Sequence, residues 1–264
     1  MSRTTYMFDN RTPEAQKQLG FLAGILDAHS FEVLAGLDIA PGSRCLDIGP
    51  GAGTVTRWLA DAVGDTGRVV ALDVEPQHVP AGGVIEVRQG DVRVVDLDPE
   101  GFDLIHARLV LMHIPERVEV LRRLVAALRP GGRIVLSEWD CTELDRMLVH
   151  ATDPAAFDAV TAFQRALIAH GESHGMSPTW AREVPAAMAA AGLPDVEATV
   201  FNKLWAGGEP GCLLHASNSH QREAALLAQG ATTEQLETLR AAMVDPATLA
   251  WSYLMYTTVG RRPA

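Results

Sequence analysis

The chain has 264 residues, a formal net charge of −11, and 47% hydrophobic against 21% charged residues. This composition is that of an ordinary globular protein and excludes disordered and collagen-like chains, while the length suits one substantial core. The acidic balance and the lack of any Lys/Arg run longer than two residues argue against nucleic acid or anionic lipid as a partner.

Neither the cysteines nor the apolar residues indicate export or a membrane anchor. The three cysteines are far apart and odd in number, so they predict no disulfide framework. No run of about 20 apolar residues is present, and the first twelve residues lack an apolar signal core. We therefore expect a cytoplasmic protein that does not cross a membrane.

The first half of the chain alternates between helical and extended patterns. Apolar residues recur at helical spacing over the first forty residues, and Pro41-Gly42 ends that region. The pattern that follows predicts strands at 44–48, 69–73, 84–87 and 102–106, helices at 54–63 and 116–128, and a further strand beginning at 134. Near-continuous apolar strands that alternate with helices predict a parallel sheet with both faces covered.

The second half is less regular. It predicts helices at 155–170 and 180–191, a strand at 196–204, a mostly helical stretch at 213–243 broken at Gly230, and a last strand at 251–259. Ligands of such α/β sheets bind at the carboxyl ends of the strands. The residues that directly follow each strand are therefore the candidate site.

The loop after the first strand contains Asp47, Gly49, Gly51 and Gly53. Glycines let a backbone approach a ligand closely, and the helix that follows directs free N–H groups at the site. The dinucleotide fingerprint G-x-G-x-x-G is absent, because its third glycine would fall on a threonine. A carboxylate two residues before the first glycine would repel a pyrophosphate and attract an amino group or a sulfonium.

This loop resembles the first motif of class I S-adenosylmethionine (SAM)-dependent methyltransferases, and further motifs follow in the expected order. They are Asp73 at the end of the second strand, Asp91-Val92, the strand 102–108 with its exit, the turn 128–133, and the closing 259–263. The overall layout resembles actinobacterial small-molecule and natural-product methyltransferases.

The resemblance implies an α/β fold with a seven-stranded, mostly parallel Rossmann-like sheet that has helices on both faces. N-terminal helices and two insertions would add a helical lid. It also implies one methyltransferase domain over 1–264, with N-terminal helices at 1–42, a SAM-binding half at 43–140 and an acceptor or lid half at 141–264.

The resemblance also implies a set of residues that bind SAM and release S-adenosylhomocysteine. Asp47 would balance the amino group of SAM, Asp73 would accept hydrogen bonds from the ribose diol, and Asp91 would accept one from adenine. The implied cofactor-binding residues are Asp47, Gly49, Gly51, Gly53, Asp73, Val74, Asp91, Val92, Ala107, Arg108 and Tyr6.

Methyl transfer is an in-line displacement that proximity alone accelerates, so a general base is optional. His113, just after the fourth strand, is the candidate base because imidazole titrates near neutral pH, and His106 is a weaker candidate. Glu138 and its neighbours leave the fifth strand, where they would line the acceptor pocket. His170 and His174 lie four residues apart, but no third ligand is evident, so no metal is predicted.

We expect methyl transfer to oxygen, nitrogen or carbon of a small organic acceptor, most of all a secondary metabolite. The alternative is a methyltransferase-fold enzyme that binds SAM for other chemistry, such as cyclisation or decarboxylation. A SAM sensor without enzymatic activity and a nicotinamide dehydrogenase are more distant alternatives. The residues leave the oligomeric state open, with a homodimer as one arrangement, and they do not identify the acceptor.

Overall fold

The computed structural model describes residues 13–264, which form two compact units. The unit that we call the sheet unit comprises Asp27–Trp139, Trp180–Phe201 and Met255–Ala264. The helical unit comprises 13–26, 140–179 and 202–254. Residues 180–201 and 255–264, from the second half of the chain, belong to the sheet unit.

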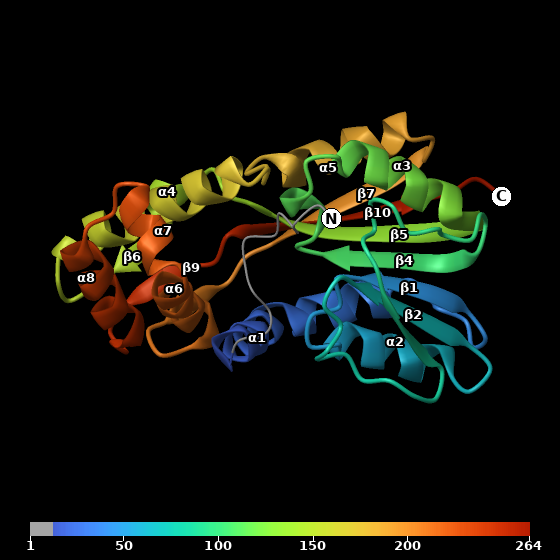
Figure 1. Cartoon of the computed structure of the whole chain (residues 1–264), viewed down its shortest axis with the longest axis horizontal. Helices are drawn as coiled ribbons and strands as arrows, with labels where there is room; N and C mark the ends of the chain where they lie inside the picture. Colours follow the sequence, from blue (N-terminus) through green and yellow to red (C-terminus); the bar gives the residue numbers. More distant parts are fainter. Residues whose placement is uncertain (1–12) are drawn as a thin grey trace. The chain divides into compact units, whose positions relative to one another are not determined.

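A seven-stranded sheet in the order β3-β2-β1-β4-β5-β10-β7 forms the centre of the sheet unit (Figure 1). Its strands are β1 (Arg44–Ile48), β2 (Arg68–Asp73), β3 (Ile85–Gln89), β4 (Phe102–Arg108), β5 (Leu128–Asp140), β7 (Asp195–Phe201) and β10 (Leu254–Arg261). β1 pairs in parallel with β2 and β4, as do β2 with β3 and β4 with β5, whereas β10 and β7 are antiparallel. The predicted α/β fold with a seven-stranded, mostly parallel sheet is confirmed.

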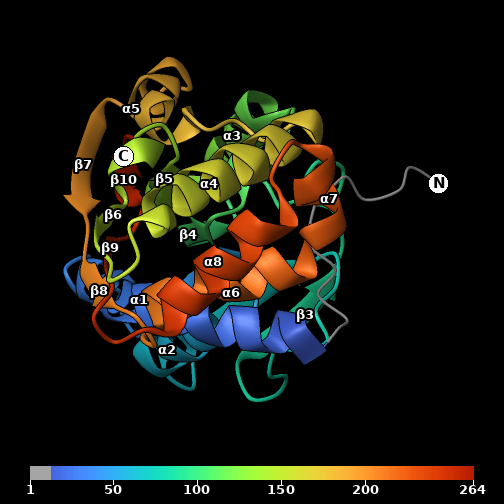
Figure 2. The same ribbon diagram turned by 90° about the vertical axis from the view of Figure 1, so that its left-hand side faces the viewer.

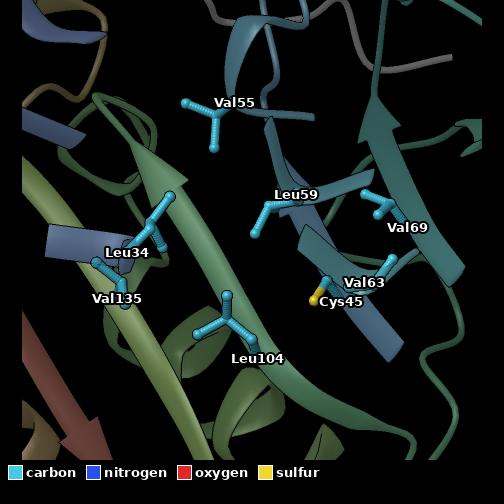
Figure 3. Close-up of a cluster of buried hydrophobic side chains, with 8 residues drawn as sticks. All are labelled: Leu34, Cys45, Val55, Leu59, Val63, Val69, Leu104 and Val135. Carbon is cyan, nitrogen blue, oxygen red and sulfur yellow. The ribbon is translucent and has the colours of Figure 1, made fainter. Parts of the chain in front are cut away.

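Helices cover both faces of this sheet. On one face, side chains of α1 (Pro13–Ala35) and α2 (Thr54–Val63) join strand residues in a buried apolar cluster (Figure 3). The cluster consists of Leu34, Cys45, Val55, Leu59, Val63, Val69, Leu104 and Val135. On the other face, Met188 of α5 (Trp180–Ala190) approaches the backbone of Gly260 beside Ile134 of β5, and α3 (Arg117–Ala127) packs against α5.

The helical unit is built from α4 (Ala155–Ser173), α6 (Pro210–Gln221), α7 (Glu223–Ala228), α8 (Thr233–Val244) and the first half of α1. α8 packs against both α4 and α6 (Figure 2). A three-stranded sheet in the order β6-β9-β8 completes it, with β6 (Leu148–His150), β8 (Leu204–Ala206) and β9 (Leu249–Trp251). None of the helices within 13–264 has the length and apolar character that a membrane span needs.

Several elements differ from their predictions, among them the three that follow. The described part of the N-terminal region is one continuous helix, since Gly24 does not break α1 but lets the ring of Pro210 approach closely. The predicted last strand is two strands in different sheets, because Ser252 and Tyr253 leave the pleat between β9 and β10. β5 begins at Leu128, where the Pro-Gly-Gly turn shifts the register against β4 and does not end the pairing.

Candidate functional site

The loop between β1 and α2 adopts a backbone that favours glycine at three positions. Gly49, Gly51 and Gly53 have φ of 61°, 55° and 69°, in the left-handed region. Space excludes side chains as well, since a Cβ at Gly49 would lie 2.5 Å from Cγ2 of Val110. At Gly53 the added Cβ would lie 2.4 Å from Cδ of Pro80. The loop is thus closely packed backbone without side chains at its glycines, and it lies at the carboxyl end of β1 directly before a helix N-terminus.

Asp47 is held inside the protein beneath this loop. Its side chain is 1% exposed, and its two oxygens bond to different elements. Oδ2 accepts from the Thr56 hydroxyl of α2 at 2.6 Å, and Oδ1 lies 2.8 Å from Nδ1 of His106 on β4. The structure therefore brings the predicted residues Asp47 and His106 together. Asp47 therefore holds the loop in place from below and contributes its negative charge there. Because both of its oxygens already have partners inside the protein, this geometry does not favour direct contact of Asp47 with a ligand.

Two further predicted acids follow β2 and β3. Asp73 ends β2, where its Oδ1 accepts from the amide of Glu75 at 2.8 Å. Desolvation raises the pKa of Asp73, and the negative charges of Glu75 and Asp47 add to this effect. Hydrogen-bond donors from a ligand would stabilise the charged form of this partly buried carboxyl. Asp73 therefore fits the role of binding a diol.

Asp91 has a partner on each oxygen. Arg93 donates from Nε to Oδ1 at 3.0 Å and from Nη2 to Oδ2 at 2.6 Å, which lowers the pKa of Asp91. The next side chain, Val92, is 6% exposed, and its carbonyl accepts from Arg123 at 2.6 Å. The turn after β3 is thus firmly anchored, and an adenine amine would have to share the Asp91 carboxylate with Arg93.

A polar cluster at the end of β4 includes a residue that the sequence did not single out, Asp27 of α1. Arg108 donates to Asp27 at 3.0 Å and to Ser30 at 2.9 Å, and Thr54 donates to the same Asp27 oxygen at 3.0 Å. Asp27 therefore ties α1 to the first residue of α2 and to the exit of β4. Its signal in the sequence is an acid directly after the apolar pair Ile25-Leu26, at a position where a helix covers a sheet. Ala107, which precedes Arg108, is fully buried.

His113 ends the short 3-10 helix Leu111–His113 that follows β4. Burial and the positive charge of Arg117 lower the pKa of His113 to about 4, so the imidazole is neutral at pH 7. Beneath this turn, Glu138 of β5 is fully buried, and desolvation raises the pKa of its carboxyl to about 8.

Other predicted features are placed elsewhere. The ring centroids of His170 and His174 lie 4.4 Å apart at the end of α4. In the described part of the chain no three His, Cys, Asp or Glu side chains form a group that could hold a metal ion. Val74, which follows Asp73, accepts from Gln89 Nε2 through its carbonyl at 3.0 Å. Tyr6, the remaining predicted cofactor contact, lies outside the described residues.

The match to a known family covers the strands and loops that build this site. Residues 46–136 match the family model of the methyltransferase domain. With the strand order and the glycine loop, this match supports the resemblance of residues 46–136 to the Rossmann-like domain of class I, SAM-dependent methyltransferases. The predicted resemblance is confirmed at this level.

Curated relatives match over part of their length. The chain is 32% identical over 150 residues to an uncharacterized transposon protein of Streptomyces fradiae, which covers 53% of the chain and 44% of that protein. It is 30% identical over 111 residues to the ubiquinone/menaquinone biosynthesis C-methyltransferase UbiE of Ectopseudomonas mendocina, which covers 38% of the chain and 43% of that enzyme. The chain therefore spans less than half the length of these two relatives.

Solved structures share the fold at low identity. Phosphoethanolamine N-methyltransferase 2 of Haemonchus contortus, solved with phosphomonomethylethanolamine and S-adenosylhomocysteine, matches with a TM-score of 0.58 and 16% identity over 99% of this chain and 59% of that one. The YcgJ protein of Bacillus subtilis matches with a TM-score of 0.56 and 14% identity over 90% of this chain and 99% of that one.

Proposed function

We propose that the protein transfers the methyl group of SAM to a small organic acceptor and releases S-adenosylhomocysteine. The observation that carries this proposal is the glycine loop, where Gly49, Gly51 and Gly53 have left-handed φ values and the neighbours of Gly49 and Gly53 leave no room for a side chain. The methyltransferase-domain match over 46–136 and the solved neighbours with bound cofactor support the same conclusion.

The residues present fit SAM. The glycine backbone accommodates the methionyl part, and Asp73 accepts hydrogen bonds from the ribose diol. Val74, Asp91 and Val92 are the residues proposed to line the adenosine side, and the fully buried Ala107 supports the end of β4 behind them. Asp47 acts through the loop that it braces, because its oxygens already accept from Thr56 and His106. Arg108 orders the β4 exit through Asp27.

Bound SAM supplies an electrophilic methyl group on a sulfonium. This methyl group would pass to a nucleophilic atom of the acceptor, S-adenosylhomocysteine would leave with the electron pair of the broken bond, and the acceptor would lose a proton. His113 is the residue proposed to take that proton, since a lowered pKa leaves its imidazole neutral and able to accept. His106 is the weaker candidate, because as a base it would have to act from a buried position beside Asp47.

The proposed acceptor is a small secondary metabolite. Named relatives support a small molecule, since UbiE is named for quinone biosynthesis and the Haemonchus contortus enzyme was solved with phosphomonomethylethanolamine. The resemblance to natural-product methyltransferases supports the narrower class.

Calorimetric titration with SAM, S-adenosylhomocysteine and NAD in parallel tests the cofactor assignment. We expect micromolar binding of SAM and of its demethylated product, and no binding of NAD. Release of S-adenosylhomocysteine with a panel of small acceptors then tests transfer. Binding of NAD alone, or of none of the three, would contradict the proposal.

A further inference from the structure

The turn that leaves β4 has a conformation that is costly for its sequence. Leu109 has φ of +56°, in the left-handed region that disfavours residues with a Cβ by about 1–2 kcal/mol. Its amide still donates to the carbonyl of Ser137 on β5 at 2.8 Å. Such strain persists only where the surroundings fix the backbone, so the turn needs a partner that holds it.

Glu138 is that partner. Its Oε1 accepts from the amide of Leu111 at 2.8 Å, and the neighbouring amides of Val110 and Met112 act with it to lower the pKa of the carboxyl against the effect of burial. The side chain is fully buried, and Oε2 has no hydrogen-bond partner among residues 13–264. This carboxyl group thus satisfies the N–H of Leu111, the first residue of the short helix, which no strand or helix would otherwise satisfy.

The same turn contacts both parts of the proposed site. A methyl group of Val110 lies where a Cβ on Gly49 would have to be, so the turn closes against the glycine loop. His113 lies at the end of the same short helix, where its amide donates to the carbonyl of Val110 at 3.1 Å. A shift of the turn would therefore displace both the glycine loop and His113, the candidate base.

We propose that Glu138 is a positioning residue, which holds the strained 109–113 turn so that Val110 supports the SAM loop and His113 faces the reaction. The effect on SAM binding and on His113 rests on the proposed function. The hydrogen bond between Glu138 and the turn is present without any ligand. The raised pKa of the Glu138 carboxyl fits this role, because a neutral carboxyl accepts from the Leu111 amide without placing a full charge in the core.

Two variants of Glu138 and one control variant test whether Glu138 positions the 109–113 turn or only fills space in the core. Glu138→Gln keeps a neutral oxygen for the amides and mimics the protonated acid, whereas Glu138→Leu removes the acceptor at similar volume. Leu136→Ala is the matched control, because Leu136 is a fully buried residue of the same strand whose register partner is Ala107 and not the turn.

The measurements are the Kd for S-adenosylhomocysteine and the hydrogen exchange of the amides at 110–112. We expect Glu138→Leu to raise the Kd about tenfold and to speed exchange at these amides at least about tenfold, as the loss of a buried acceptor implies. Glu138→Gln should stay within about threefold of wild type. Unchanged Kd and exchange in Glu138→Leu, or equal effects in Leu136→Ala, would overturn the inference.

A spectroscopic readout keeps the inference testable if Glu138→Leu does not fold. The amide resonance of Leu111 should move with pH near 8 in wild type as the carboxyl titrates, and should not move in Glu138→Gln. A Leu111 resonance that is insensitive to pH in wild type would overturn the inference. Failure of wild type to bind S-adenosylhomocysteine would instead contradict the proposed function, while the exchange and resonance data would still test the role of Glu138.

Discussion

At the scale of single residues, Asp73 is expected to decide cofactor affinity. Burial raises the pKa of this carboxyl, so two hydroxyl donors from a ribose would stabilise its charged form. Hydrogen bonds to a charged group contribute about 1.5–3 kcal/mol each. Asp73→Ala should therefore weaken SAM binding at least about tenfold for each bond lost, measured by calorimetric titration.

Asp61→Asn is the control for Asp73, because Asp61 is an exposed residue of α2. It should bind SAM as wild type does. Unchanged affinity in Asp73→Ala would mean that the end of β2 does not contact the cofactor.

His113 is expected to affect turnover more than cofactor binding. If it accepts the proton of the acceptor, His113→Ala should lower kcat by about 10²–10⁴-fold and change the Kd for SAM little. Because its pKa is lowered to about 4, its protonation should reduce the rate only in acid, as pH falls toward 4, and not between about pH 6 and 9. Wild-type turnover in His113→Ala would remove it as a base.

Residue types and spacing predicted where the acids lie but not what they contact. Asp47 and Asp91 stand where the motif order placed them, yet Thr56, His106 and Arg93 already bond to their oxygens. A motif fixes the position along a strand. The partner of a buried carboxylate is set by neighbouring elements that the chain brings together only on folding.

At the scale of elements, Asp27 is expected to couple α1 to the SAM loop. Asp27 and Arg108 are 19% and 14% exposed, so removal of the acid leaves a poorly solvated cation. Asp27→Asn and Thr54→Val should each weaken SAM binding, and the double variant should lose less than the sum of both. The coupling in that cycle should be about 0.5–3 kcal/mol, measured by SAM titration of the four proteins.

Glu32→Gln serves as the control on the same helix, because Glu32 is exposed and more than one turn from Asp27. Strict additivity of Asp27→Asn and Thr54→Val would show that the bond between them does not transmit to the loop.

Elements with a strong period could be predicted, and short ones could not. β1, β2 and β4 are buried apolar runs, and their alternation with helices specifies a parallel sheet. β6, β8 and β9 have three residues each, which is too short for any period to show. Their pairing depends on contacts between residues about 50–100 positions apart, such as Leu148 with Ala250 and Trp205 with Ala250.

At the scale of the whole molecule, the division into two units could not be predicted from chain order. Residues 180–201 and 255–264 return to the sheet unit after the chain has built parts of the helical unit. The cause is β10, which pairs with β7 in the large sheet although β9, only two residues earlier, belongs to the small one. The predicted single domain and its helical lid concern how the units act together, and they stay predictions.

The acid stability of the whole chain should depend on a histidine in the helical unit. His215 is 5% exposed, its Nδ1 lies 3.3 Å from Nε2 of Gln164, and burial lowers its pKa to about 4. Because the unfolded chain binds this proton near pH 6.5 and the folded chain only near 4, stability is present above that window and is lost as pH falls through it. The loss amounts to about 3 kcal/mol at full burial.

His215→Gln, which is neutral throughout, should remove this slope, so calorimetric unfolding at pH 4.5, 5.5 and 7 should show a smaller fall in unfolding free energy than in wild type. His220→Gln changes an exposed histidine of the same helix and should keep the wild-type slope. An identical slope in wild type and His215→Gln would show that the pKa of His215 is the same in the folded chain as in the unfolded chain. That outcome would mean that the interior of the helical unit admits water or a counter-charge to this histidine.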